Sequence, residues 1–247
     1  MGRSEAAWFL ERGDHFLYLA GLRRRQALFA EAEELLQQAT IDAHEDASQL
    51  QWIELEKALL AIDLGQLDVG FEKLVSLIDK CDDDDGLLLE ARNCLGWVHF
   101  CQHDWVEALE HFEKAASMLD RFADGGVDLE MAISFAGAAA AQMQLPVAAR
   151  KPGHEEMAVK FLHRFKFQQA HGVQIAKYCL GTCKVLQDCS EEASQLFADA
   201  LDVQCTVCAA GHPRNGLFQE KSQAKAHKQH QVSVSLTLVA NATGLSC

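Results

Sequence analysis

The sequence has little of what β-rich folds need. Only three of its 247 residues are proline and two are tyrosine, and runs of Val, Ile and Thr are few. This scarcity argues against an all-β fold. Ala, Leu, Glu and Gln dominate instead, and these residues favour helices. A hydrophobic content of 49% is too high for a disordered acidic chain. We therefore expect an all-α globular fold.

Basic residues are also scarce. The chain has 22 Lys and Arg against 36 Asp and Glu, which gives a formal net charge of −14. Sequence-independent binding to nucleic acid depends on clustered Lys and Arg that neutralise phosphates. Attraction to anionic lipid has the same requirement. We therefore expect neither nucleic acid nor a membrane as a partner.

The N-terminus lacks the apolar run of a secretory signal peptide. Without such a signal, the nine cysteines, an odd count, are expected to be reduced thiols in a cytoplasmic protein. Residues 131–149 carry no charge, but they consist largely of Ala, Gly, Ser and Gln rather than Leu, Ile and Phe. Such a segment favours a closely packed helix over a membrane span.

One pattern of small and apolar residues occurs twice with identical spacing. A Leu-Gly pair is followed by Ala twelve residues after the Gly, then by Phe four residues later and by Ala three residues after that. The two copies are Leu95, Gly96, Ala108, Phe112 and Ala115, and Leu180, Gly181, Ala193, Phe197 and Ala200. The spacing predicts two antiparallel helices, with Gly where they cross closely and with Phe and the last Ala filling the seam.

This pattern resembles the tetratricopeptide repeat, a 34-residue helix–turn–helix unit. The resemblance implies an all-α, right-handed superhelix of about five antiparallel helix pairs. Residues 1–207 would form this repeat domain. The fourth copy contains an insertion at Arg150–Gly153, after which the spacing resumes at Ala158. In this register the copies lie near residues 13–46, 51–84, 89–122, 130–165 and 174–207.

Residues 208–247 do not continue the repeat. They are polar and basic around 221–231 and alternate apolar and hydroxyl residues over 232–239. We expect a flexible C-terminal tail. The Gly211-His212-Pro213 sequence after the last copy is similar to the kinesin-light-chain type of the family.

The resemblance also implies a concave groove that binds peptides through the first helix of each repeat. The second, fifth, ninth, twelfth and thirteenth positions of each copy would face it. They hold apolar and aromatic residues with acidic ones such as Asp63 and Glu90. Trp and Tyr are common anchors at interfaces, so the expected partner is an apolar or amphipathic peptide or helix with basic flanks. The candidate partner-binding residues are Trp52, Leu55, Leu59, Asn93, Trp97, Phe100 and Tyr178.

These residues have two other interpretations, core packing and a clamp for a chaperone carboxylate. Aromatic residues at helical spacing also occur as core packing. Family members that grip the acidic C-terminus of heat-shock chaperones use Lys, Arg and Asn, whereas the central copies here have Asn93 alone. Because a carboxylate requires charge-assisted donors, we do not expect this chain to bind such tails.

Metal and catalytic motifs are weak. Cys205, Cys208 and His212, together with Cys179 and Cys183, form the best zinc candidate. However, buried Cys behaves as a small apolar residue, so we expect no metal. His99 lies at a seam position and is expected to be packed or hydrogen-bonded. No Gly-rich phosphate loop or nucleophile elbow occurs, so neither a cofactor nor a catalytic residue is assigned.

These observations predict a non-catalytic adaptor or scaffold that binds a partner peptide or helix in an apolar concave groove. The alternative is a structural subunit of a multiprotein complex. In that case the seam of the terminal repeat would dock against another chain.

Overall fold

The computed structural model describes residues 15–44, 46–81, 85–122, 126–146, 152–165, 172–208 and 212. Across these residues the regular structure is helical, as the composition predicted. The α-helices are α2 (His15–Arg25), α3 (Phe29–Asp42), α4 (Ala47–Asp63), α5 (Leu67–Lys80), α6 (Asp85–Gln102), α7 (Trp105–Ala116), α8 (Asp128–Gln144), α9 (His154–Arg164), α10 (Val173–Leu186) and α11 (Ser190–Val207), with the 3-10 helix η1 (Ser117–Arg121) after α7.

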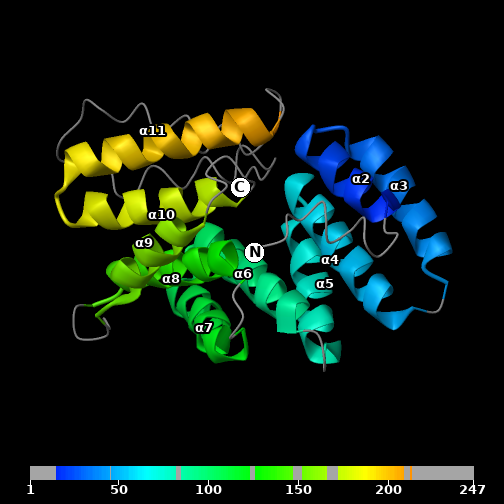
Figure 1. Cartoon of the computed structure of the whole chain (residues 1–247), viewed down its shortest axis with the longest axis horizontal. Helices are drawn as coiled ribbons and strands as arrows, with labels where there is room; N and C mark the ends of the chain where they lie inside the picture. The colour runs from blue at the N-terminus through cyan, green and yellow to red at the C-terminus, as the bar shows by residue number, and fades with distance from the viewer. Residues whose placement is uncertain are drawn as a thin grey trace.

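The helices form five consecutive antiparallel pairs, α2/α3, α4/α5, α6/α7, α8/α9 and α10/α11 (Figure 1). Each first helix also packs on the first helix of the next pair, so that α2, α4, α6, α8 and α10 make one continuous layer. We call this the first-helix layer. The predicted all-α stack of five helix pairs is confirmed.

The predicted seam between the helices of a pair is also confirmed. A Cβ at position 96 would lie 3.0 Å from ring carbons of Phe112, and one at position 181 would lie 2.7 Å from the ring of Phe197. Both rings are buried. Glycine is therefore required where α6 and α10 meet their partner helices.

Phe112 also joins two neighbouring pairs. A Cβ at position 137 of α8 would lie 2.5 Å from the Phe112 ring, which is fully buried at 0% exposure. The ring from α7 thus fits between the backbones of α6 and α8. Close packing of this kind leaves no room for an additional methyl group.

Four pairs share one turn geometry. Their second helices begin after a residue with left-handed backbone, fourteen residues after the first residue of each predicted copy. These residues are Ala27 (φ 58°), Gly65 (φ 78°), His103 (φ 68°) and Asp188 (φ 61°). In each turn the next residue donates its backbone N–H to a carbonyl five residues earlier, as for Gln66 to Ala61 at 2.8 Å. This closes the C-terminus of the first helix as a Schellman motif.

The fourth pair departs from this geometry. Residues 145–153 separate α8 from α9, in agreement with the insertion expected near Arg150–Gly153, of which 150 and 151 lie outside the described residues. After it, Ala158 and Leu162 are buried at the seam positions where the repeat spacing resumes. The pair therefore forms despite the longer connection.

Two further predictions concern the C-terminal segment 208–247 and the uncharged segment 131–149. Apart from Cys208 and His212, the expected tail at 208–247 lies outside the described residues, and a domain boundary at 207 stays a prediction. Within the described ranges, no helix combines the length and the hydropathy of a transmembrane span. The uncharged segment of α8 is instead packed, with residues Ala138 to Ala141 all buried.

Candidate functional site

Three of the four aromatic residues predicted for the groove, Trp97, Phe100 and Tyr178, are joined in one cluster. Trp97 on α6 stacks on Phe100 with ring centroids 5.8 Å apart, and it meets Tyr178 on α10 edge-on at 5.8 Å. Phe100 continues to Trp105, and Tyr178 continues to Phe197. Trp97, Phe100 and Tyr178 are only 8%, 3% and 2% exposed. These contacts give the three aromatics a packing role that ties the third pair to the fifth.

The other predicted groove residues lie nearer the N-terminal pairs. Leu55 and Leu59 are buried in the core between α4, α5 and α6. Trp52 is half-buried and packs against the cores of both the first and the second pairs. Among the seven candidates, Trp52 is therefore the one side chain that is not buried. A role of these residues in partner binding stays a prediction.

Asn93 makes hydrogen bonds between two helices of the first-helix layer. Its Nδ2 donates to the backbone carbonyl of Glu130 at 3.0 Å, and its Oδ1 accepts from the Ser134 hydroxyl at 2.8 Å. Asn93 is 5% exposed and Ser134 is fully buried. The amide thus pins α6 to α8, because buried polar groups require hydrogen-bond partners.

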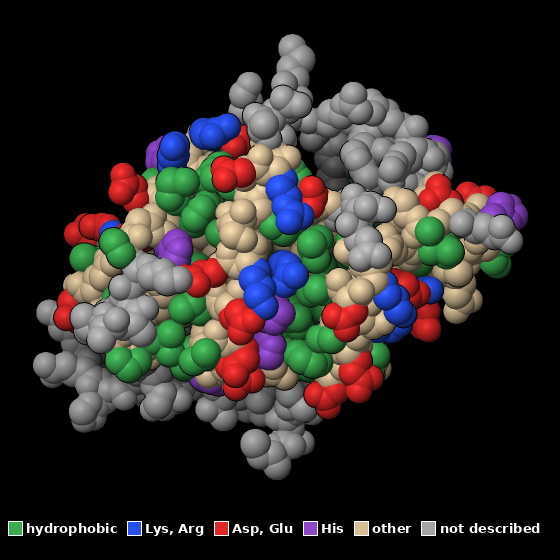
Figure 2. Space-filling view, turned by 90° about the horizontal axis from the view of Figure 1, so that it is seen from below, with side chains coloured by type: hydrophobic (Ala, Val, Ile, Leu, Met, Phe, Trp, Pro, Cys, Tyr) green, Lys and Arg blue, Asp and Glu red, His purple; other side chains and the backbone are tan. Residues whose placement is uncertain are grey.

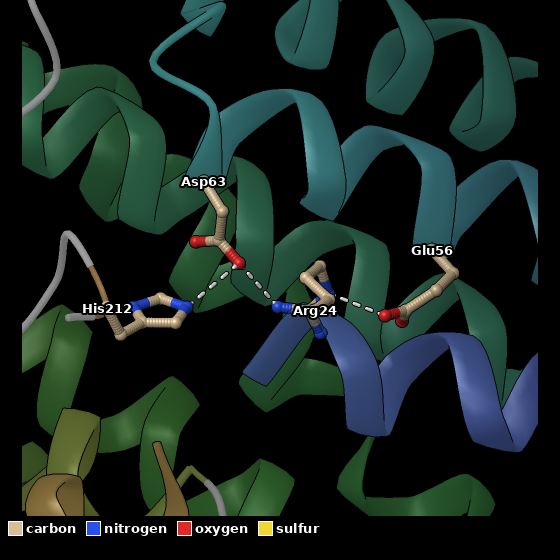
Figure 3. A network of polar contacts seen from close by, with 4 residues as sticks. All are labelled: Arg24, Glu56, Asp63 and His212. Atoms are coloured by element: carbon tan, nitrogen blue, oxygen red, sulfur yellow. Dashed lines mark hydrogen bonds and ion pairs between the residues drawn. The ribbon is translucent and has the colours of Figure 1, made fainter. Parts of the chain in front are cut away.

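A buried ionic network joins α2 to α4 (Figure 3). Arg24 donates from Nε to Glu56 Oε1 at 2.5 Å and from Nη1 to Asp63 Oδ2 at 2.7 Å. The side chains of Arg24 and Asp63 are 3% and 0% exposed. Burial alone lowers the pKa of Arg24, but the Glu56 and Asp63 carboxylates raise it above its ordinary value. The guanidinium therefore stays charged inside the protein.

A residue from beyond the last helix completes this network. His212 Nε2 lies 3.6 Å from Asp63 Oδ2 (Figure 3). The imidazole also meets the ring of Phe29 edge-on, with centroids 6.1 Å apart. The His212 side chain is 1% exposed. The sequence suggested His212 as a zinc ligand beside Cys205 and Cys208, whereas the structure places it against the first two helix pairs.

The burial of Arg24 in this site was not predicted from the sequence. The signal was available in the register of the first copy, 13–46, whose twelfth and thirteenth positions are Arg24 and Arg25. Both are buried, as is Asp63 at the thirteenth position of the second copy. The facing positions of the first copy therefore indicated a cation beside Asp63 of the second copy.

His99 and His111 form a packed pair between α6 and α7. Their rings stack with centroids 5.4 Å apart, and His99 meets Phe71 of α5 edge-on at 5.3 Å. Burial, followed by the neighbouring His99 and Arg92, lowers the pKa of His111 to about 4. The predicted packing role of His99 is confirmed, and His111 is neutral at pH 7.

The cysteines proposed as zinc ligands differ in their exposure to solvent. Cys179, Cys183 and Cys208 are buried and Cys205 is exposed. Burial raises the pKa of Cys179 well above its ordinary value and that of Cys183 to about 12. These two thiols are therefore protonated and pack as small apolar groups. Among the described residues, no three His, Cys, Asp or Glu side chains are grouped as metal ligands.

The outer surface carries apolar side chains between charged ones, as Figure 2 shows for one face. Val106 on α7 is 60% exposed, and Val185 on α10 is 45% exposed. In the repeat register Val185 is the twelfth residue of the fifth copy and hence a facing position. Val185 therefore gives the first-helix layer an accessible apolar side chain, and Val106 gives one to a second helix.

Comparison with known proteins supports the repeat assignment. A family model described as Tetratricopeptide repeat matches residues 88–119, which cover most of α6 and all of α7. Among solved structures, the crystal structure of BtubC (BKLC) from P. vanneervenii is 17% identical, with a TM-score of 0.49, over 91% of this chain and 85% of that chain. No curated protein sequence matches. The predicted tetratricopeptide repeat is confirmed, and the kinesin-light-chain subtype stays a prediction.

Proposed function

Because the chain is a tetratricopeptide repeat protein, and such repeats generally act as protein-interaction modules, we propose that it is a non-catalytic adaptor. Its first-helix layer binds a partner peptide or helix. The observation that carries this proposal is the unbroken contact of α2, α4, α6, α8 and α10, which places the first helices of all five copies side by side in one layer.

The partner that fits this surface is an amphipathic segment with basic flanks. The net charge of −14 attracts a basic segment from a distance. Trp52, which is half-buried, and Val185, which is exposed, offer apolar contact at facing positions of the second and fifth copies. Apolar anchors with charged flanks are the usual mode in which a helix binds a groove.

The contacts of Asn93 and the burial of two thiols bear on two other functions, the binding of chaperone tails and catalysis. The amide of Asn93 is engaged with Glu130 and Ser134, which supports our expectation that it does not grip a chaperone carboxylate. Burial keeps the thiols of Cys179 and Cys183 protonated, so these two residues are poor nucleophiles. Placement in the cytoplasm remains part of the proposal.

The proposal is tested by Val185→Asp, with Val106→Asp as the matched control. Both valines are exposed, so neither substitution should unfold the protein, which circular dichroism checks. We expect affinity capture from lysate, followed by mass spectrometry, to recover at least one partner with wild type and Val106→Asp. Its yield with Val185→Asp should fall by about tenfold, because a charge replaces an apolar contact.

The alternative of a structural subunit predicts a different result. If the terminal seam beside α11 were the docking surface, the captured proteins would be the same for all three chains. Partners lost only with Val106→Asp would instead place the interaction on the second helices. Either result would contradict binding by the first-helix layer.

A further inference from the structure

We propose that Asp63, together with Phe29, forms a seat for a cationic or imidazole side chain. His212 is its intramolecular occupant, and a basic partner segment competes with His212 for it. The competition rests on the proposed function, whereas the docking of His212 does not.

The geometry of the seat comes from three helices. Asp63 is the last residue of α4, Arg24 belongs to α2, and Phe29 is the first residue of α3. The oxygen Oδ2 of Asp63 lies between Arg24 Nη1, at 2.7 Å, and His212 Nε2, at 3.6 Å (Figure 3). The edge-on ring of Phe29 closes the seat on a second side of the imidazole. A flat nitrogen base therefore fits between an aromatic ring and a carboxylate.

The charge of the seat favours a second cation. The carboxylate of Asp63, which pairs with the guanidinium of Arg24, is fully buried. A buried carboxylate needs paired cations and hydrogen bonds to offset its loss of hydration. Asp63 also stands at the C-terminus of α4, where the helix dipole adds negative potential and favours positive groups. A protonated imidazole, an ammonium or a guanidinium beside Asp63 would balance both contributions.

The position of the seat links it to the partner surface. Arg24 and Asp63 occupy facing positions of the first and second copies in the repeat register. His212 lies five residues beyond Val207, the last residue of α11. A residue that follows the fifth pair in the sequence therefore contacts the first two pairs. A partner that crosses the whole first-helix layer must pass this contact, and a basic side chain on it would meet the same carboxylate.

Hydrogen–deuterium exchange of the full chain tests the docking of His212 by a charge series. The variants are His212→Ala, His212→Lys and His212→Glu, with His163→Ala on the exposed face of α9 as control. The reporters are the amides that close the end of α4, those of Leu64, Gly65 and Gln66. We expect exchange to be on the order of tenfold faster in His212→Ala and faster again in His212→Glu.

His212→Lys separates charge from shape, since it keeps a cation at the seat and should retain wild-type exchange rates. His163→Ala should change nothing at α4. Unchanged rates in both His212→Ala and His212→Glu would overturn the docking. Equal acceleration in all three His212 variants would overturn the role of charge and leave shape as the only determinant.

Competition is tested with a defined probe, a fluorescein-labelled amphipathic Leu/Lys peptide of about 18 residues. Fluorescence anisotropy measures its affinity for each full-length variant. We expect binding to His212→Ala to be about fivefold tighter than to wild type, because an occupied seat lowers the apparent affinity by the fraction that is free. His212→Lys should bind the probe no better than wild type.

Equal affinity for wild type, His212→Ala and His212→Lys would overturn the competition. This result is distinct from failure of the proposed function, which shows itself as capture of the same partners by wild type and Val185→Asp. The exchange experiment uses no partner, so the docking of His212 is decided independently of both.

Discussion

At the scale of single residues, burial decides the chemical character of side chains that would otherwise be reactive. His99 and His111 stack on each other, and Phe71 covers the edge of the pair. Burial lowers the pKa of His111 to about 4, because a charged imidazole there loses its hydration. The same effect keeps the Cys183 thiol protonated by raising its pKa to about 12. Groups that are candidate ligands by residue type thus act as packing groups in this fold.

The lowered pKa of His111 predicts a pH dependence of stability. Its folded-state pKa is about 4 against an ordinary value of 6.5. Between these values the unfolded chain binds more protons than the folded one, so stability is fully present above about pH 6.5 and declines as pH falls toward 4. We expect His111→Gln to weaken the decline between pH 7 and 5, measured by urea denaturation. His163→Gln on the surface is the control, and an unchanged slope in His111→Gln would contradict the assignment.

At the scale of the elements, the turn between paired helices is the repeated unit. Ala27, Gly65, His103 and Asp188 all adopt left-handed backbone at equivalent positions, although only one of them is glycine. A side chain there costs about 1–2 kcal/mol relative to glycine. At Ala27 the turn is imposed by the packing of the two helices on each other, since Ala has no intrinsic preference for this conformation. The sequence spacing predicted the pairs, but the strained turn residues were not identified from it.

Replacing Ala27 by glycine should relieve this strain. We expect Ala27→Gly to raise the free energy of unfolding by about 0.5–1 kcal/mol, the steric gain being partly offset by the greater freedom of glycine in the unfolded chain. The matched control is Ala30→Gly, in the first turn of α3, where the same substitution lowers helix stability by about 0.5–1 kcal/mol. Urea denaturation measures both. Destabilisation by Ala27→Gly would show that strain in this turn is not significant.

At the scale of the whole molecule, a few side chains hold successive pairs together. Arg24 links the first pair to the second, Asn93 and Phe112 link the third to the fourth, and Trp97 and Tyr178 link the third to the fifth. In a stack of repeats these contacts carry the coupling between units. Loss of one such link should therefore affect more than its own pair.

The Arg24 link gives the clearest prediction at this scale. Arg24→Met keeps most of the side-chain volume but leaves Glu56 and Asp63 without their cation. Removing one partner of a buried ion pair costs about 3–5 kcal/mol. The control is Arg23→Met, whose ion pair with Glu31 is 38% and 54% exposed and contributes about 0–1 kcal/mol. Urea denaturation at pH 7 compares the two variants, and equal losses would contradict a buried network.

The sequence alone determined the helical class, the pair as the folding unit and the positions of its seams. These features depend on local periodicity: Gly96 and Phe112 are sixteen residues apart in one helix–turn–helix unit, and helix geometry fixes their relation. The insertion before α9 was visible for the same reason, because it interrupts a regular spacing.

Only the tertiary structure decided which facing residues are buried and which charges meet. Trp97 and Tyr178 touch because α6 and α10 come together through the stack, and Arg24, Asp63 and His212 meet from three separate parts of the chain. Such contacts depend on the angle at which each pair packs on the next. That angle is set by the combined shape of many side chains, and no single spacing in the sequence encodes it.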